Sequence, residues 1–301
     1  MHSFLLAAFF EFSRTATAMS FTGLLLLLIA IWAVKSDVAQ GRGLDRVIAL
    51  SNLCFAIPLA AFGAEHLSAA NSIKDGVPSY IPWHLFWAYF VGFALLAASL
   101  SIATKIEVRW SGLLFGIMIF SFVAMLHLPR LHANLRDRIS WAVAIRDMSF
   151  AGGGWILAGT AMGGLRGKGG SLITIGRVLV AVAAIFFGVE HFLHPLGLPG
   201  VPLAKEIPTW VPARALIDYL TGAFLLAGGV CFLLGKKTRI AAAYLGGWIV
   251  LLVLIIYGPM LVGALADPST DVKVEGLNYF FDTLLFGGTI LALASAVPAS
   301  E

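Results

Sequence analysis

The sequence predicts an all-α integral membrane protein with about nine transmembrane helices, arranged as one N-terminal helix plus two parallel four-helix repeats. Of its 301 residues, 59% are hydrophobic and only 12% are charged, whereas soluble domains have about one quarter charged residues. Apolar runs divide the chain at intervals of about 30 residues, which suits a crossing of about 20 residues plus a connection. An internal repeat groups the helices. These observations exclude a soluble domain.

Nine apolar runs are long enough to cross a membrane. They lie at about residues 17–34, 47–65, 81–104, 110–128, 139–163, 175–193, 212–234, 240–262 and 277–297. We expect the first run to stay in the mature protein, because a charge-poor stretch precedes it and no small-residue cleavage pattern follows it. Residues 4–12 are expected to form a short interfacial helix that leads into it.

The basic residues and the cysteines exclude two function classes. The net charge of +4 comes from Lys and Arg spread over short loops rather than gathered in a patch, so nucleic acid is not an expected partner. Cys54 and Cys231 both lie within apolar runs and outside any C-x-x-C, so a redox pair is not expected. Basic residues are somewhat more frequent in alternate turns, which predicts that the N-terminus is outside and the C-terminus is cytoplasmic.

Two segments of the chain repeat each other. FGAEH at 62–66 matches FGVEH at 187–191, and VPSYIP at 77–82 matches IPTWVP at 207–212. At an offset of 130 residues, His127 then falls on Tyr257 and Pro129 on Pro259, and further along Asp147 resembles Asp282. Each copy has an even number of helices, so both enter the membrane from the same side as a parallel repeat.

These matches predict three regions. Residues 1–39 hold the N-terminal interfacial and transmembrane helix, 40–165 form the first four-helix repeat and 166–301 form the second. A Gly- and Lys-rich stretch at 163–176 connects the repeats. Below, 40–165 is called the first half and 166–301 the second half.

The repeated motifs are similar to those of a known family. The G-x-E-H at a helix end, the following P-x-[YW]-[IV]-P, a Y-x-x-G helix and a basic turn resemble the DoxX family of bacterial membrane proteins, here with the unit doubled. The resemblance covers most of residues 45–298. It implies a four-helix membrane bundle in the bacterial cytoplasmic (inner) membrane. Some relatives are linked to thiosulfate:quinone oxidoreductase, quinone resistance or thiol stress, and many have no assigned activity.

Ionisable groups within membrane helices are costly, so they are candidates for function. All seven histidines and several carboxylates are expected near the outer face. Glu65, His127 and Asp147 are the candidate catalytic residues, as groups able to exchange protons with a bound quinone. The candidate substrate- or cofactor-binding residues are His66, Tyr80, His84, Trp87, Arg130, Arg146, Glu190, His191, Asp218 and Asp282. The first half holds more of these groups than the second.

Other interpretations of the same residues remain open. Glu65 could pair with Arg146 or His127 and merely lock helices together, and adjacent positions 100° apart should not let Glu65 and His66 share one face. The aromatic residues around 80–89 also suit an interfacial belt. A metal site at His66, His84, His127 and His132 is not expected, because no H-x-x-x-H places two ligands on one helix face.

Three functions fit the sequence. The first is a quinone-interacting membrane oxidoreductase component with a polar site near the outer face. The second is a non-catalytic membrane subunit or scaffold for a partner, which the short loops favour. The third is a small-solute transporter, which the duplication favours but the lack of broken midplane helices does not. The expected partners are the lipid bilayer and either a membrane redox protein or a second copy of the chain.

Overall fold

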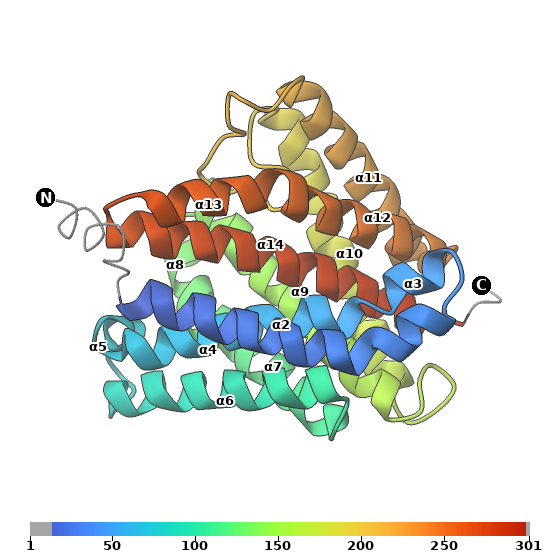
Figure 1. Cartoon of the computed structure of the whole chain (residues 1–301), viewed down its shortest axis with the longest axis horizontal. Helices are drawn as coiled ribbons and strands as arrows, with labels where there is room; N and C mark the ends of the chain where they lie inside the picture. The colour runs from blue at the N-terminus through green and yellow to red at the C-terminus, as the bar shows by residue number, and fades with distance from the viewer. Residues whose placement is uncertain (1–13, 299–301) are drawn as a thin grey trace, which may run out of the picture.

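The computed structural model describes residues 14–298, and these form a bundle of long helices (Figure 1). Seven long helices are α2 (Arg14–Gln40), α4 (Ser51–Ser68), α6 (His84–Thr104), α9 (Arg138–Ala161), α10 (Gly170–Leu193), α11 (Arg214–Leu234) and α14 (Thr270–Ala296). Within this range there is no β-strand, only an isolated bridge between Gly197 and Glu206. The predicted interfacial helix at 4–12 and His2 lie outside the described residues.

Two further long segments each contain a π-helical turn. α7 (Val108–Phe122) continues through η2 (Val123–His127) into α8 (Leu128–Ala133), and α12 (Thr238–Leu252) continues through η3 (Val253–Tyr257) into α13 (Gly258–Ala266). Pro129 and Pro259 follow the π-turns and lack the amide hydrogen that a regular helix would use there. Short pieces complete the fold: α3 (Leu44–Ile48), α5 (Ala70–Ile73) and the 3₁₀ turn η1 (Lys74–Gly76).

The predicted all-α polytopic membrane fold is confirmed. Eight helical segments of the described chain are long and apolar enough to cross a membrane. The ninth predicted crossing corresponds to α9, which has 24 residues but carries Arg146 and Asp147 within its length. The nine segments alternate in direction, so the ends of α4 and α10 and the starts of α6 and α11 lie at one end of the bundle. We call this the histidine-rich end: His66, His84, His191 and His194 lie at or beside these helix ends, and His127 and His132 lie in η2 and α8, where the segment that runs antiparallel to α6 ends.

A stretch of backbone recurs 130 residues later. α6, α7 and η2 have the same lengths as α11, α12 and η3, and every bound is shifted by 130. The turns repeat as well, since residues 83, 105 and 107 have positive φ and so do 213, 235 and 237. Helix packing follows the same plan: α4 lies on α6 as α10 lies on α11, and α7 lies on α9 as α12 lies on α14.

Glycines allow the closest of these contacts. A Cβ on Gly63 would lie 2.9 Å from the carbonyl oxygen of Gly92, and a Cβ on Gly188 would lie 3.0 Å from that of Gly222. Any larger residue would push the helices apart. Small residues therefore set the α4–α6 and α10–α11 spacing, as is common in membrane helix pairs.

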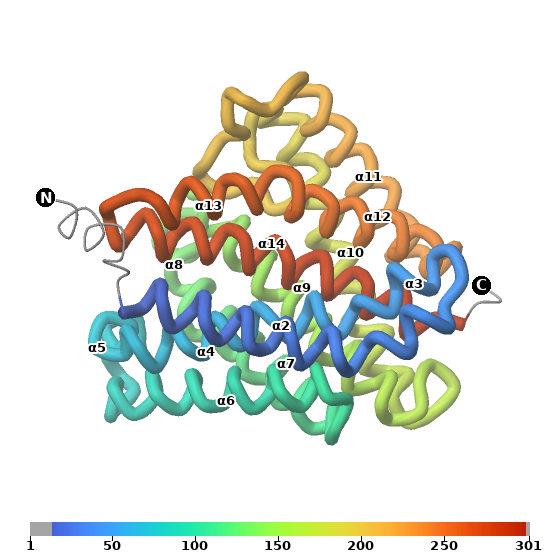
Figure 2. The backbone as a smooth tube through the Cα atoms, viewed as in Figure 1, coloured from blue at the N-terminus to red at the C-terminus, as the bar shows by residue number. Residues whose placement is uncertain are grey.

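α14 joins the two halves. In Figure 1 it crosses the middle of the molecule, between the first half below and most of the second half above. It packs against α12 of its own half and against α4 and α9 of the first half, and it has the largest buried share of the eight apolar segments. Figure 2 shows the first turn of α2 and the last turn of α14 at opposite ends of the bundle. The first half is therefore completed by a helix from the second.

Candidate functional site

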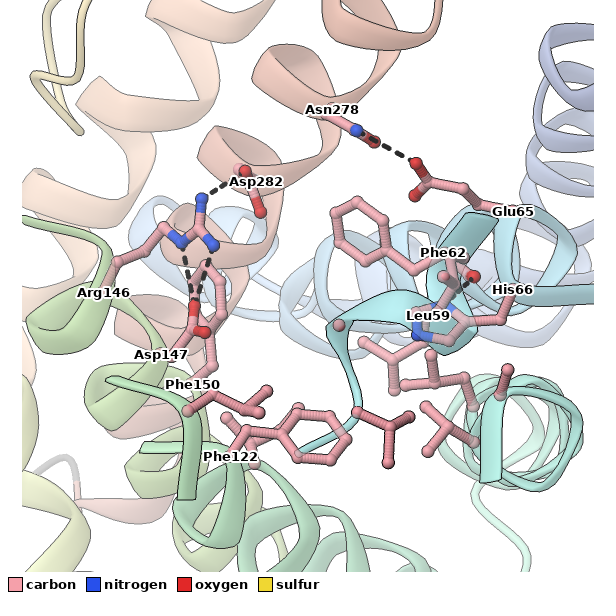
Figure 3. A pocket seen from close by; sticks show the side chains of 18 of the residues that line it. Leu59, Phe62, Glu65, His66, Phe122, Arg146, Asp147, Phe150, Asn278 and Asp282 are labelled. Carbon is pink, nitrogen blue, oxygen red and sulfur yellow. Dashed lines mark hydrogen bonds and ion pairs between the residues drawn. The ribbon is translucent and has the colours of Figure 1, made fainter. Parts of the chain in front are cut away.

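A cavity of about 720 Å³ lies among α4, α6, α7, α9 and α14, toward the histidine-rich end. Its walls are mostly apolar, with side chains such as Phe62, Val91, Leu95, Phe115 and Phe122. Polar groups gather on the sides formed by α4, α9 and α14 (Figure 3). The size and the mixture of an apolar wall with few polar groups are typical of small-molecule sites.

An ionic network forms the polar wall on α9 and α14. The Arg146 guanidinium donates from Nε to Oδ1 of Asp147 at 2.9 Å and from Nη1 to Oδ2 of Asp282 at 2.5 Å. Behind it, Nε2 of His127 lies 2.8 Å from Oδ2 of Asp147. These side chains are at most 15% exposed. The network therefore links the π-turn η2, α9 and α14 through side chains that are largely buried.

The charges of this network do not cancel. One guanidinium faces two carboxylates, Asp147 and Asp282, so the three groups together carry one net negative charge when ionised. A buried cluster whose charges do not cancel is costly within a membrane. The wall therefore borders the cavity with two carboxylates and a single guanidinium.

Glu65 faces the cavity from α4, and among residues 14–298 its side chain pairs with an amide rather than with a basic group. Its Oε1 accepts a hydrogen bond from Nδ2 of Asn278 at 3.1 Å. The pairing of Glu65 with Arg146 or His127, considered from the sequence, is wrong, because Arg146 is taken up by Asp147 and Asp282 on the opposite wall. In Figure 3, Glu65 points toward α14 while Arg146 lies across the cavity.

His66 lines the same cavity from the next position of α4. Its Nδ1 lies 2.8 Å from the carbonyl oxygen of Phe62, so Nδ1 is the protonated nitrogen, because a carbonyl only accepts. Glu65 and His66 are adjacent positions on α4 and so point in different directions from it, yet both border the cavity. The cavity is wide enough to contact both side chains, although they leave α4 in directions about 100° apart.

The structure brings many of the predicted site residues together. The predicted residues that line the cavity are Glu65, His66, Trp87, Arg130, Arg146, Asp147 and Asp282. His127 does not line it but contacts Asp147 from behind. Tyr80, which is 69% exposed, and His84 lie outside the lining. Asp282 belongs to the second half in sequence, and α14 places it at the cavity of the first.

The remaining predicted residues form a second group in the second half. Nδ1 of His191 lies 2.7 Å from Oδ1 of Asp218, and both side chains are fully buried. Glu190 instead pairs with Arg138 of α9 at 2.9 Å. Glu190, His191 and Asp218 therefore do not border the cavity of the first half.

The sequence reasoning missed three residues of α14. Asn278, Tyr279 and Glu275 line the cavity together with Asp282. They precede Asp282 by four, three and seven positions, which is the spacing of one helix face. That periodicity is visible in the sequence, but nothing there indicates that this face turns toward the first half.

Metal ligands are not gathered in the part of the chain that the structure describes, where no three His, Cys, Asp or Glu side chains are placed to hold an ion together. His66, His84, His127 and His132 come from four different segments. Among the carboxylates of the cavity, Asp147 and Asp282 pair with Arg146, and Glu65 pairs with Asn278.

No protein-family model, curated protein or solved structure matches this chain. The likeness to the DoxX family therefore rests on the motifs of the sequence.

Proposed function

We propose that this chain is a quinone-interacting component of a membrane redox system, with the site in the cavity of the first half, and that it is a doubled member of a DoxX-like family. The observation that carries the proposal is a cavity with mostly apolar walls and one ionic wall at the histidine-rich end. A quinone has the same division, with a flat apolar ring and two polar oxygens.

The residues of the cavity have separate tasks in this proposal. Phe62, Phe115 and Phe122 provide flat apolar surface for a ring. Glu65 and the network of Arg146, Asp147 and Asp282 bracket that space from opposite sides. A bound quinol supplies two protons and two electrons on oxidation. Glu65 and the network are groups that can take up the protons, and His127 connects the network to the π-turn behind it. The electron partner would be a separate membrane protein.

Mass spectrometry of an organic extract from the gently purified protein tests the proposal. We expect about one quinone per wild-type chain and a several-fold loss in Glu65→Gln, because the amide removes the proton acceptor on α4. Glu190→Gln is the matched control, since Glu190 occupies the equivalent position 125 residues later and does not line the cavity. Absence of quinone from the wild type, after reconstitution into quinone-containing lipid, would contradict the proposal.

A second candidate function is a scaffold subunit that docks a partner, and it is favoured by the ion pairs that tie the halves together. Arg138 reaches Glu190 at 2.9 Å, and Arg146 reaches Asp282 at 2.5 Å. If the buried polar groups of the first half serve only to hold the bundle together, Glu65→Gln and His127→Ala lower the melting temperature without changing bound quinone. The same extract measurement therefore separates the two functions.

A further inference from the structure

In the second half, a loop fills the place that is a cavity in the first. The chain from Leu196 to Ile207 forms a short hairpin, closed by hydrogen bonds from Leu198 N to Lys205 O and from Ile207 N to Leu196 O. Leu198, Val201 and Ile207 are at most 2% exposed. This hairpin enters the second half in the region between α10, α12 and α14.

The hairpin lies at positions equivalent to the cavity lining. The cavity residues His66, Val91, Leu95, Ile119 and Phe122 correspond to His191, Thr221, Leu225, Ile249 and Leu252. All five counterparts have no exposed surface. A Cβ on Gly200 would lie 3.3 Å from Ile249, which places the hairpin tip against the counterpart of Ile119. The tip therefore occupies the space that a ligand would occupy in the first half.

The peptide at the tip makes two hydrogen bonds with side chains of that space. The carbonyl oxygen of Pro199 accepts from the hydroxyl of Tyr257 at 3.0 Å. The amide of Gly200 donates to Nε2 of His191 at 3.1 Å. The tip thus presents one acceptor and one donor to its surroundings.

The histidine has the same tautomer in both halves. Nε2 of His191 accepts from an amide, so Nδ1 carries the proton and faces Asp218. His66 also has its proton on Nδ1, held by the Phe62 carbonyl. In both halves Nε2 is the acceptor, and in the first half it belongs to a residue that lines an open cavity.

Tyr257, the donor to the Pro199 carbonyl, corresponds to His127, which does not line the cavity but contacts Asp147 of the ionic network. We propose that the hairpin tip imitates the natural ligand, and that the cavity selects a ligand whose hydroxyl donates to Nε2 of His66 while another oxygen accepts from Arg146, the lining donor of that same network. Building on the proposed function, this ligand is the quinol, because the oxygens of a quinone only accept. Arg146 lines the cavity, and its guanidinium has five N–H donors, of which three meet Asp147 and Asp282.

Isothermal titration of the full chain in detergent tests this selection. The probes are a short-chain benzoquinone, its quinol kept reduced without oxygen, and the dimethyl ether of that quinol, which has no donor. We expect the wild type to bind the quinol about tenfold more tightly than either other probe, the effect of one well-formed hydrogen bond. In His66→Phe the preference falls to within about twofold, and in His66→Gln part of it returns because the amide oxygen accepts. His84→Phe, which alters a histidine outside the lining, should behave as the wild type.

Each other result has a definite meaning. Equal binding of quinone and quinol, or a preference that persists in His66→Phe, overturns the inference and leaves the proposed function standing. If none of the probes binds to a wild type that melts cooperatively, both the inference and the proposed function fall.

Discussion

The loop after α4 and the loop after α10 hold equivalent places in the two halves, and they act in opposite ways. The first loop, with Ile73, Gly76 and Ile81, borders an open cavity. The second is five residues longer, since the offset between the halves rises from 125 at His66 to 130 at His84. Those extra residues allow a hairpin to reach the interior. Five residues in one loop therefore separate a site that can take a ligand from one that is filled by its own chain.

The largest loss of stability is expected when the ionic network of Arg146, Asp147 and Asp282 is broken, a network with no counterpart among the described residues of the second half. Arg146→Met leaves Asp147 and Asp282 buried without their cation, and such a loss costs about 3–5 kcal/mol. We expect a strongly lowered melting temperature in detergent. Arg109→Met, at a side chain that is 54% exposed, is the control and should change little. Adding Asp147→Asn and Asp282→Asn to Arg146→Met should restore part of the stability; no recovery would mean that Arg146 acts by packing alone.

A smaller loss of stability is expected when a methyl group is added at Gly200, at the tip of the hairpin. Gly200 has a φ of +109°, and an added Cβ would lie 3.3 Å from Ile249 and 3.4 Å from Thr283. Gly200→Ala should therefore destabilise the protein by about 1–3 kcal/mol. Gly76→Ala, in the corresponding loop of the first half, meets nothing within 4 Å and should be nearly neutral. Thermal unfolding of both variants measures the contrast, and equal effects would show that the tip is not closely packed.

Removing one hydroxyl from the second half is expected to cost about 1–2 kcal/mol. Tyr257→Phe takes away the only described donor to the Pro199 carbonyl, which is buried with the hairpin. Tyr244→Phe, at a residue that is 65% exposed, serves as the control. Bound quinone in Tyr257→Phe should equal that of the wild type. A loss of quinone there would mean that the second half contributes to the site.

The smallest effect concerns the start of α9. Asp137 caps this helix by accepting from the amide of Ile139 at 3.1 Å, and the hydroxyl of Ser140 also donates to it. The Ser140 hydrogen bond lowers the pKa of Asp137 below its ordinary value. The ionised form is therefore the stabilising one: its contribution is full above about pH 5 and is lost as the pH falls below about 4. Asp137→Ala should lower the melting temperature by about 1–2 °C at neutral pH, and the difference from the wild type should shrink in acid.

The helices and the repeated segments could be predicted because their signals are local. Each described crossing coincides with an apolar run, and the offset of 130 residues found in the sequence recurs in the bounds of α6 and α11 and of α7 and α12. The ends of the helices could not be predicted as well as their centres. α2 continues to Gln40 and α14 begins at Thr270, because polar residues extend each helix beyond its apolar run. Hydrophobicity identifies the part of a helix that lipid requires and not its ends.

The composition of the site depended on packing between distant segments, which local signals do not report. Asp147 and Asp282 were recognised as equivalent positions, but their sharing of Arg146 requires α14 to lie against α9. The hairpin had a sequence signal that was not used. Residues 195–203 read PLGLPGVPL, without a charged or hydrogen-bonding side chain, although a loop in water is usually polar. An apolar loop indicates a buried one.

The position of α14 also has a consequence for the order in which the chain is built into a membrane. Arg146 and Asp282 are separated by 136 residues, so three further membrane-crossing segments are synthesised between the end of α9 and the start of α14. During that interval Arg146 has a partner only on its own helix, Asp147, which in turn has His127 from the preceding segment. Arg146, Asp147 and His127 come from neighbouring segments of the chain, so the charge of Arg146 is paired before α14 is present. The cavity acquires its α14 wall only after α14 has been synthesised and inserted, so the order of synthesis keeps the site incomplete until that helix is in place.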